Sequence, residues 1–131
     1  MACSKDTFET KPTIKVKDLN SEVIVRNSKL DITLEYTDKE GDLGNGELTY
    51  IRVRQNIKAG PPGNDKADTV HYPIPVFPPK SKGEIVISVD YDFMDEDPAY
   101  DDTMIFKLSV IDIRGNKSDT VTTKSVIAKE N

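Results

Sequence analysis

The stretch Leu30-Asp31-Ile32-Thr33-Leu34-Glu35-Tyr36-Thr37 alternates apolar and polar side chains without interruption. Successive side chains of a β-strand point to opposite faces of a sheet, so this alternation predicts a strand with one face in a core and the other in water. A helix would spread the same apolar residues around its axis instead. The stretch therefore favours an antiparallel sheet that is covered on one side.

The same period of two recurs from residue 12 onward, and no stretch shows a helical period of useful length. The chain is therefore predicted to be all-β. The run 48–54 follows a turn with three glycines at 38–46, and we expect it to pair back on 30–37. The residues expected to form a shared core are Leu30, Ile32, Leu34, Tyr36, Ile51, Val53, Ile85, Ile87, Val89, Phe106, Leu108 and Val110.

Residues 56–83 differ from the rest because they contain six prolines, which cannot donate a backbone hydrogen bond to a sheet. A long connection is predicted here, with at most an edge strand at 69–72. The only histidine, His71, is then expected at the surface of that edge strand.

About seven short strands separated by turns are typical of an immunoglobulin-like antiparallel two-sheet β-sandwich. The split apolar runs at 14–16 and 23–25 predict a first strand in two pieces, and the turn at 114–117 predicts a closing hairpin with 121–127. A chain of 131 residues has room for one such domain, which we place at 12–131.

Composition excludes several classes of function. The formal net charge of -5 disfavours an interface with nucleic acid or anionic lipid. One Cys and one His, far apart in sequence, exclude an internal disulfide and a multi-Cys zinc site, and they make a Cys–His nucleophile pair improbable. Without a Trp there is no large aromatic platform for a sugar ring. We expect a protein that is not an enzyme.

Two segments carry a resemblance to a known group of proteins. Tyr-Thr-Asp-Lys-Glu-Gly-Asp-Leu-Gly at 36–44 and Val-Ile-Asp-Ile-Arg-Gly-Asn-Lys-Ser-Asp-Thr-Val at 110–121 resemble the Ig-like and cadherin-like domains of bacterial surface lipoproteins. The resemblance covers about 20 positions and implies a β-sandwich. The Cys and Trp core of antibody domains is missing, so that subclass is not implied.

The residues Met1-Ala2-Cys3-Ser4-Lys5-Asp6 resemble a truncated bacterial lipobox, in which a small residue precedes the cysteine that is lipidated. This resemblance implies that Cys3 carries a lipid, that Met1 is an added start residue, and that 1–11 form a lipobox remnant and flexible tether. It also implies an outer-membrane lipoprotein that is surface-exposed or faces the periplasm. The alternative is a cytosolic protein with an incidental Cys3.

The turn after the 30–37 stretch holds three carboxylates, Asp38, Glu40 and Asp42, at alternate positions. Carboxylate oxygens are ligands that Ca²⁺ accepts, and cadherin-like modules imply calcium-binding turns. Asp112 or Asn116 would then add a ligand from the closing hairpin. The segment does not match the EF-hand loop, and an ordinary polar turn explains it as well. Calcium is the only cofactor that we consider.

Seven acidic residues lie between positions 90 and 102, where we expect a loop between two strands: Asp90, Asp92, Asp95, Glu96, Asp97, Asp101 and Asp102. This density suggests a docking surface for a basic protein or glycan partner or a second calcium site, with a solvated loop that prevents edge-to-edge association as the alternative. Tyr100 beside the loop is a candidate for the tyrosine corner of Ig-like sandwiches.

The hypothesis that these features favour is a non-enzymatic, lipid-anchored binding or adhesion module of the cell envelope. Its partners would meet the acidic loops at the end away from Cys3. One alternative is a small carbohydrate-active or hydrolytic accessory that uses acids of the 90–102 loop. Another is a structural subunit of an envelope complex.

Overall fold

Nine strands and one short helix lie in residues 11–39, 43–55, 69–75, 82–95 and 99–130, which the computed structural model describes. The elements are β1 Thr13–Leu19, β2 Val23–Ile24, β3 Lys29–Thr37, β4 Glu47–Arg54, β5 Thr69–Pro73, β6 Lys82–Asp90, α2 Tyr91–Met94, β7 Asp102–Ile111, β8 Val121–Thr122 and β9 Val126–Ala128. The prediction of an all-β chain is confirmed, and α2 is a single turn within the acidic segment.

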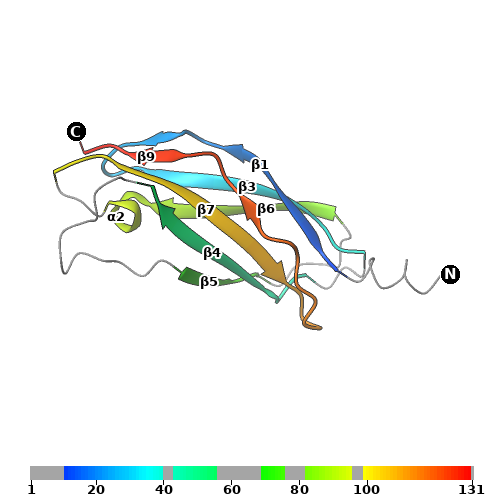
Figure 1. Cartoon of the computed structure of the whole chain (residues 1–131). Helices are drawn as coiled ribbons and strands as arrows, with labels where there is room; N and C mark the ends of the chain where they lie inside the picture. The colour runs from blue at the N-terminus through cyan, green and yellow to red at the C-terminus, as the bar shows by residue number, and fades with distance from the viewer. Residues whose placement is uncertain (1–10, 40–42, 56–68, 76–81, 96–98, 131) are drawn as a thin grey trace.

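The strands form two layers (Figure 1). One sheet has the order β1-β3-β6, and the other has the order β2-β9-β7-β4-β5, with β8 also paired to β7. All pairs are antiparallel except β2 with β9. This division, with the first strand shared between the sheets and the fourth and fifth strands on the same sheet as the closing hairpin, is the immunoglobulin-like arrangement.

The nine observed strands agree with the seven predicted ones because two of the predicted strands are each divided into two. The first strand runs as β1 in one sheet and continues as β2 in the other, which confirms the predicted split. The closing strand of the hairpin is interrupted between β8 and β9, where the backbone amide of Thr123 still donates to the carbonyl of Phe106. The edge strand predicted at 69–72 is β5, which pairs only with β4 among the described strands.

The prediction that the 48–54 run pairs back on 30–37 is wrong. β3 pairs with β1 and β6, whereas β4 pairs with β5 and β7 in the opposite sheet. The turn that joins β3 to β4 passes tightly against the end of β7: a Cβ on Gly46 would lie 2.2 Å from the carbonyl oxygen of Ile111. Only glycine permits this approach of the residue before β4 to the end of β7.

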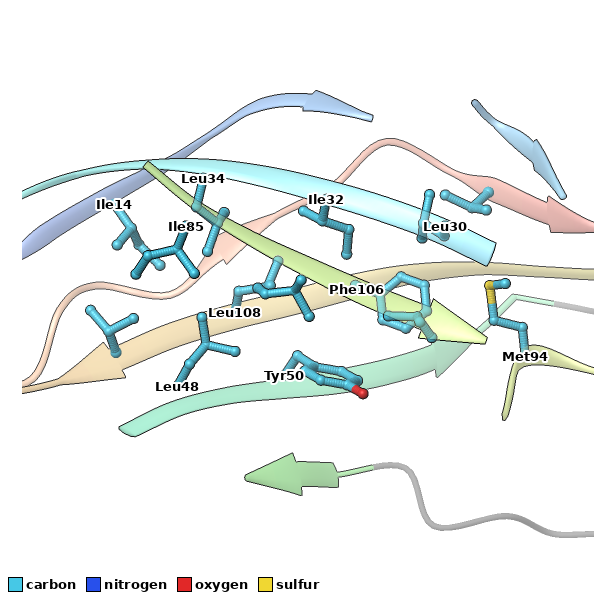
Figure 2. Packing of buried hydrophobic residues seen from close by; sticks show 14 of the residues in the cluster. Ile14, Leu30, Ile32, Leu34, Leu48, Tyr50, Ile85, Met94, Phe106 and Leu108 are labelled. Atoms are coloured by element: carbon cyan, nitrogen blue, oxygen red, sulfur yellow. The ribbon is translucent and has the colours of Figure 1, made fainter. Parts of the chain in front are cut away.

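The core fills the space between the two sheets (Figure 2). β3 contributes Leu30, Ile32 and Leu34, each fully buried, and its polar residues alternate toward the outside, as predicted. β7 faces it with Phe106 and Leu108, also fully buried. The burial of these alternate faces is the main stabilising contribution that the structure shows.

Two residues of the predicted core lie elsewhere. Ile51 and Val53 are half-buried on the outer face of β4, because Leu48, Tyr50 and Arg52 are the residues that point inward. Alternation specifies two faces but not which of them is covered. The inward Arg52 lies at the end of the core, where its guanidinium stacks over the ring of Phe93 at 5.4 Å and donates to the Phe93 carbonyl oxygen at 2.9 Å.

Truncation of Leu34 or Leu108 to Ala is expected to lower the free energy of unfolding by about 2–5 kcal/mol, because each side chain is fully buried. Ile51→Ala is the control, and we expect it to cost less than half as much because the side chain lies on the outer face. Urea unfolding measures all three. A loss below about 1 kcal/mol for Leu34→Ala would contradict the core assignment.

Candidate functional site

The predicted calcium turn is described only in part. Asp38 is buried and follows directly after β3, whereas Glu40 and Asp42 lie outside the described residues, as does Cys3. Burial, and then the charge of Asp38, raises the pKa of Tyr36. The calcium hypothesis for Asp38, Glu40 and Asp42 therefore stays a prediction.

The closing hairpin lies beside this turn, as expected, but its polar groups already have partners. The Asp112 carboxylate accepts hydrogen bonds from the backbone amides of Arg114 and Asn116 and from the Asn116 side chain at 2.8–3.1 Å. Gly115 takes a left-handed φ of 90° within the turn. Asp112 and Asn116 thus stabilise their own turn. Within the described ranges, no group of three or more His, Cys, Asp or Glu residues is placed to hold a metal ion.

Two acids of the 90–102 segment hold the fold together, contrary to the interpretation as a solvated loop. Asp102 is fully buried, and its carboxylate accepts from Nε of Arg54 at 3.1 Å. Asp101 accepts from the backbone amide of Glu130 at 2.8 Å and from Nζ of Lys129 at 3.3 Å. Glu96 and Asp97 lie outside the described residues.

These contacts belong to a larger set of side chains that fasten the C-terminal segment, which we call the C-terminal clasp: Arg26, Tyr91, Asp101, Lys129 and Glu130. Arg26 forms an ion pair with Glu130 at 2.7 Å, and the Tyr91 hydroxyl donates to the carbonyl of Lys129 at 2.6 Å. The nearby Glu130 carboxylate raises the pKa of Arg26, and burial raises the pKa of Tyr91. The clasp joins the loop before β7 to the chain that follows β9.

The tyrosine-corner hypothesis for Tyr100 stays a prediction. Tyr100 is 58% exposed, whereas Tyr91 is buried and makes the hydroxyl-to-backbone bond of the clasp. Tyr91 follows β6 directly, at the start of α2. Its alternation with Val89 signals burial, but only the folded chain brings the carbonyl of Lys129 within reach of its hydroxyl.

A concave surface of about 560 Å³ opens at the same end of the sandwich as the clasp. It is lined by Asn20, Asn27, Ser28, Lys29, Asp31, Asp90, Tyr91 and Asp92. With three carboxylates against one lysine, the lining is negative. Two of the seven predicted acids, Asp90 and Asp92, are therefore brought together here with Asn20 and with residues of the stretch 27–31.

The lining of this acidic concave surface is fixed by hydrogen bonds. The Asn20 side chain accepts from the amide of Asp31 at 2.8 Å and donates to the carbonyl of Lys29 at 3.0 Å. The Ser88 hydroxyl donates to Asp31 at 2.7 Å. Sequence reasoning missed Asn20 and Asp31, because the turn at 18–21 and the alternation of β3 each have an ordinary structural explanation. A prearranged negative surface of this kind suits a cationic group.

His71 lies on the exposed face of β5, as predicted. Its Nδ1 is 3.0 Å from the Thr49 hydroxyl and 3.2 Å from the Glu47 carboxylate, both on β4. These are cross-strand contacts of an edge strand.

Among the described residues, no helix is long and apolar enough to cross a membrane.

Comparison with known proteins gives distant likenesses in structure. The chain is similar to the PKD domain of an M14-like peptidase from Thermoplasmatales archaeon SCGC AB-540-F20, at 16% identity and a TM-score of 0.42, over 88% of this chain and 90% of that one. It is similar to the PmoD soluble domain from Methylocystis sp. ATCC 49242 (Rockwell), at 13% identity and a TM-score of 0.34, over 88% and 87% of the two chains.

A third likeness is to a β-glucosidase from Kluyveromyces marxianus, at 17% identity and a TM-score of 0.39. It covers 92% of this chain but only 15% of that enzyme. No protein-family model matches the chain, and a search of curated proteins found no match.

The clasp predicts a pH dependence of stability. The hydrogen bond from the Glu130 amide, followed by Lys129, lowers the pKa of Asp101. The ionised Asp101 carboxylate therefore contributes to the free energy of unfolding at pH values above its ordinary pKa of about 3.9. This contribution is lost as the pH falls through the lowered pKa of the folded state. We expect Asp101→Asn to destabilise the protein at pH 7 and the difference from wild type to shrink toward about pH 3. Urea unfolding across this range measures it.

The control for this prediction is Asp119→Asn, which removes an exposed carboxylate that pairs with Lys11 at the other end of the domain. We expect it to have little effect at either pH, because exposed ion pairs contribute little. An equal loss for Asp101→Asn at pH 7 and at about pH 3 would contradict the assigned role of its charge.

Proposed function

We propose that this domain is a non-enzymatic binding module of the cell envelope, anchored by a lipid on Cys3, that presents its acidic concave surface to a basic partner. The observation that carries the proposal is the position of this surface. It lies at one end of the sandwich, and the chain enters the sandwich at the other.

The entry of the chain is tied to the far end by two contacts. Thr13 at the start of β1 pairs with Thr37 at the end of β3, and Lys11 forms an ion pair with Asp119 at 2.6 Å. Figure 1 shows the start of β1 at this end and α2 at the opposite one. Residues 4–11 span at most roughly 26–29 Å when extended. A lipid on Cys3 would thus hold the entry end toward the membrane and direct the acidic concave surface away from it.

The distribution of acids supports binding rather than hydrolysis as the role of this end. Asp101 and Asp102, at the end of the acidic segment, are held in ion pairs within the fold. The carboxylates that line the concave surface stand beside Asn20, whose side chain bonds to the backbone of Lys29 and Asp31 at the start of β3. This set recognises positive charge by complementarity, and such recognition depends on salt.

The first test measures binding of a lysine-rich peptide. We expect salt-dependent binding that weakens by roughly threefold to tenfold in the double variant Asp90→Asn with Asp92→Asn, because each exposed charge pair contributes a fraction of a kcal/mol. Asp119→Asn, at the other end, is the matched control and should bind normally. Calorimetry at low and at physiological salt measures both. Equal weakening by the two changes would contradict the assignment of the surface.

The second test concerns the anchor. When the precursor is expressed with its natural upstream sequence, we expect labelled palmitate on Cys3 and recovery of the protein in the membrane fraction. Cys3→Ser should abolish both while leaving the melting temperature unchanged. Unacylated protein in the cytosol would contradict the envelope location without affecting the peptide-binding result.

A further inference from the structure

The edges of the two sheets differ in how well they are protected against pairing with another chain. β1 contains a register shift at residues 16–18, β2 has two residues, and β5 is a five-residue strand that ends in Pro73. Short strands, irregularities, proline and charged side chains are the usual protections of an edge. β6 has only the last, in Lys82, Glu84 and Asp90: nine residues pair with β3 in unbroken register, and no second strand pairs with β6 among the described strands.

The hydrogen-bonding phase of β6 is fixed at its C-terminal end. The amide of Tyr91 donates to the carbonyl of Ser28 at 3.2 Å, which makes these residues a hydrogen-bonded pair in the register that joins Lys29 with Asp90. Hydrogen-bonded and non-hydrogen-bonded pairs alternate in an antiparallel ladder. The odd-numbered residues of β6 therefore bond to β3, and Glu84, Val86 and Ser88 direct their amides and carbonyls to the open edge.

The side chains of these three residues lie on the outer face of the sheet. Val86, at the centre of the strand, is 55% exposed, while Glu84 is already paired with Lys17 from β1. Lys82 and Asp90, of opposite charge, stand at the two ends, each four residues from Val86. The strand is thus symmetric in position and complementary in charge about its central residue.

We propose that β6 pairs antiparallel with β6 of a second copy of this chain, on a two-fold axis through Val86. In this register Lys82 of each copy lies opposite Asp90 of the other, Glu84 lies opposite Ser88, and the two Val86 side chains cover each other. The two three-stranded sheets then form one continuous sheet of six strands.

Neighbouring registers are less favourable. A shift by one residue would place core-facing residues opposite outward-facing ones. A shift by two places Glu84 opposite Asp90 in one direction, which repels, and Lys82 opposite Ser88 in the other, which forms no ion pair. The opposite charges of Lys82 and Asp90 therefore favour a second copy of this chain as the partner at the open edge of β6. They also favour the register in which the two-fold axis passes through Val86.

The decisive experiment is an exchange of charge, read by sedimentation of the full chain at concentrations up to about 1 mM, the range of weak association. We expect a monomer–dimer equilibrium whose dissociation constant rises about tenfold or more in Lys82→Asp and in Asp90→Lys, because each change sets like charges opposite each other twice. Mixed in equal amounts, the two variants should form a heterodimer. Lys107→Asp, the same change on the exposed face of β7, is the control and should dimerise normally.

A second measurement tests the register with the native cysteine replaced, Cys3→Ser. Val86→Cys should be joined across the axis by a short bismaleimide, whereas Glu84→Cys should not, since its counterpart lies four residues, about 13 Å, away along the strand. Protein that stays monomeric throughout would overturn the proposal. So would mixed charge variants that fail to associate, or equal cross-linking at 84 and 86, which would indicate another occupant or register.

Discussion

The apolar layer between β3 and β7 is the constraint on which the other features depend. Leu30, Ile32 and Leu34 meet Phe106 and Leu108 there without contact to water. Because the side chains of a strand alternate, the burial of this one face fixes the outward direction of every polar residue between them. It thereby places Asp31 at the acidic concave surface and leaves β6 at the margin of its sheet.

The two ends of the sandwich are built differently. At the end where the chain enters, polar groups of the turns are hydrogen-bonded locally. Asp112 accepts hydrogen bonds within its own hairpin, and Gly46 allows a close approach of two backbone segments. At the other end, the C-terminal clasp fastens the chain that follows β9, and the ion pair of Arg54 with Asp102 joins the end of β4 to the start of β7. Buried ion pairs contribute to geometry more than to net stability. They hold in place the loops beside which the acidic concave surface opens.

The proposed pairing of β6 between two copies and the proposed lipid on Cys3 together define where the two anchors lie. Antiparallel pairing reverses the long axis of one copy relative to the other, so the two entry ends lie at opposite ends of the pair. With a lipid on each Cys3, such a pair suits contact between two facing membranes, or a pair that lies flat on one. The outer face beside β6 carries the Lys17–Glu84 ion pair and little apolar surface apart from Val86. Association through this edge would accordingly be weak for single copies and stronger for arrays.

Alternation of side chains alone determined the all-β class, the positions of the strands and most of the core, because a period of two is a local property of the chain. The interrupted apolar runs also predicted the split first strand, and the prolines of residues 56–83 predicted the exposed edge strand with His71. The pairing of β4 and the inward face that carries Arg52 were decided only by the tertiary structure. Alternation along β4 leaves both open, because it specifies two faces of a strand without specifying which face is covered or which strands lie beside it. The acidic concave surface and the clasp are likewise decided by the tertiary structure, because Asn20, Asp31 and Asp90 become neighbours only when β1, β3 and β6 pair, and Glu130 reaches Arg26 only when β9 pairs with β2.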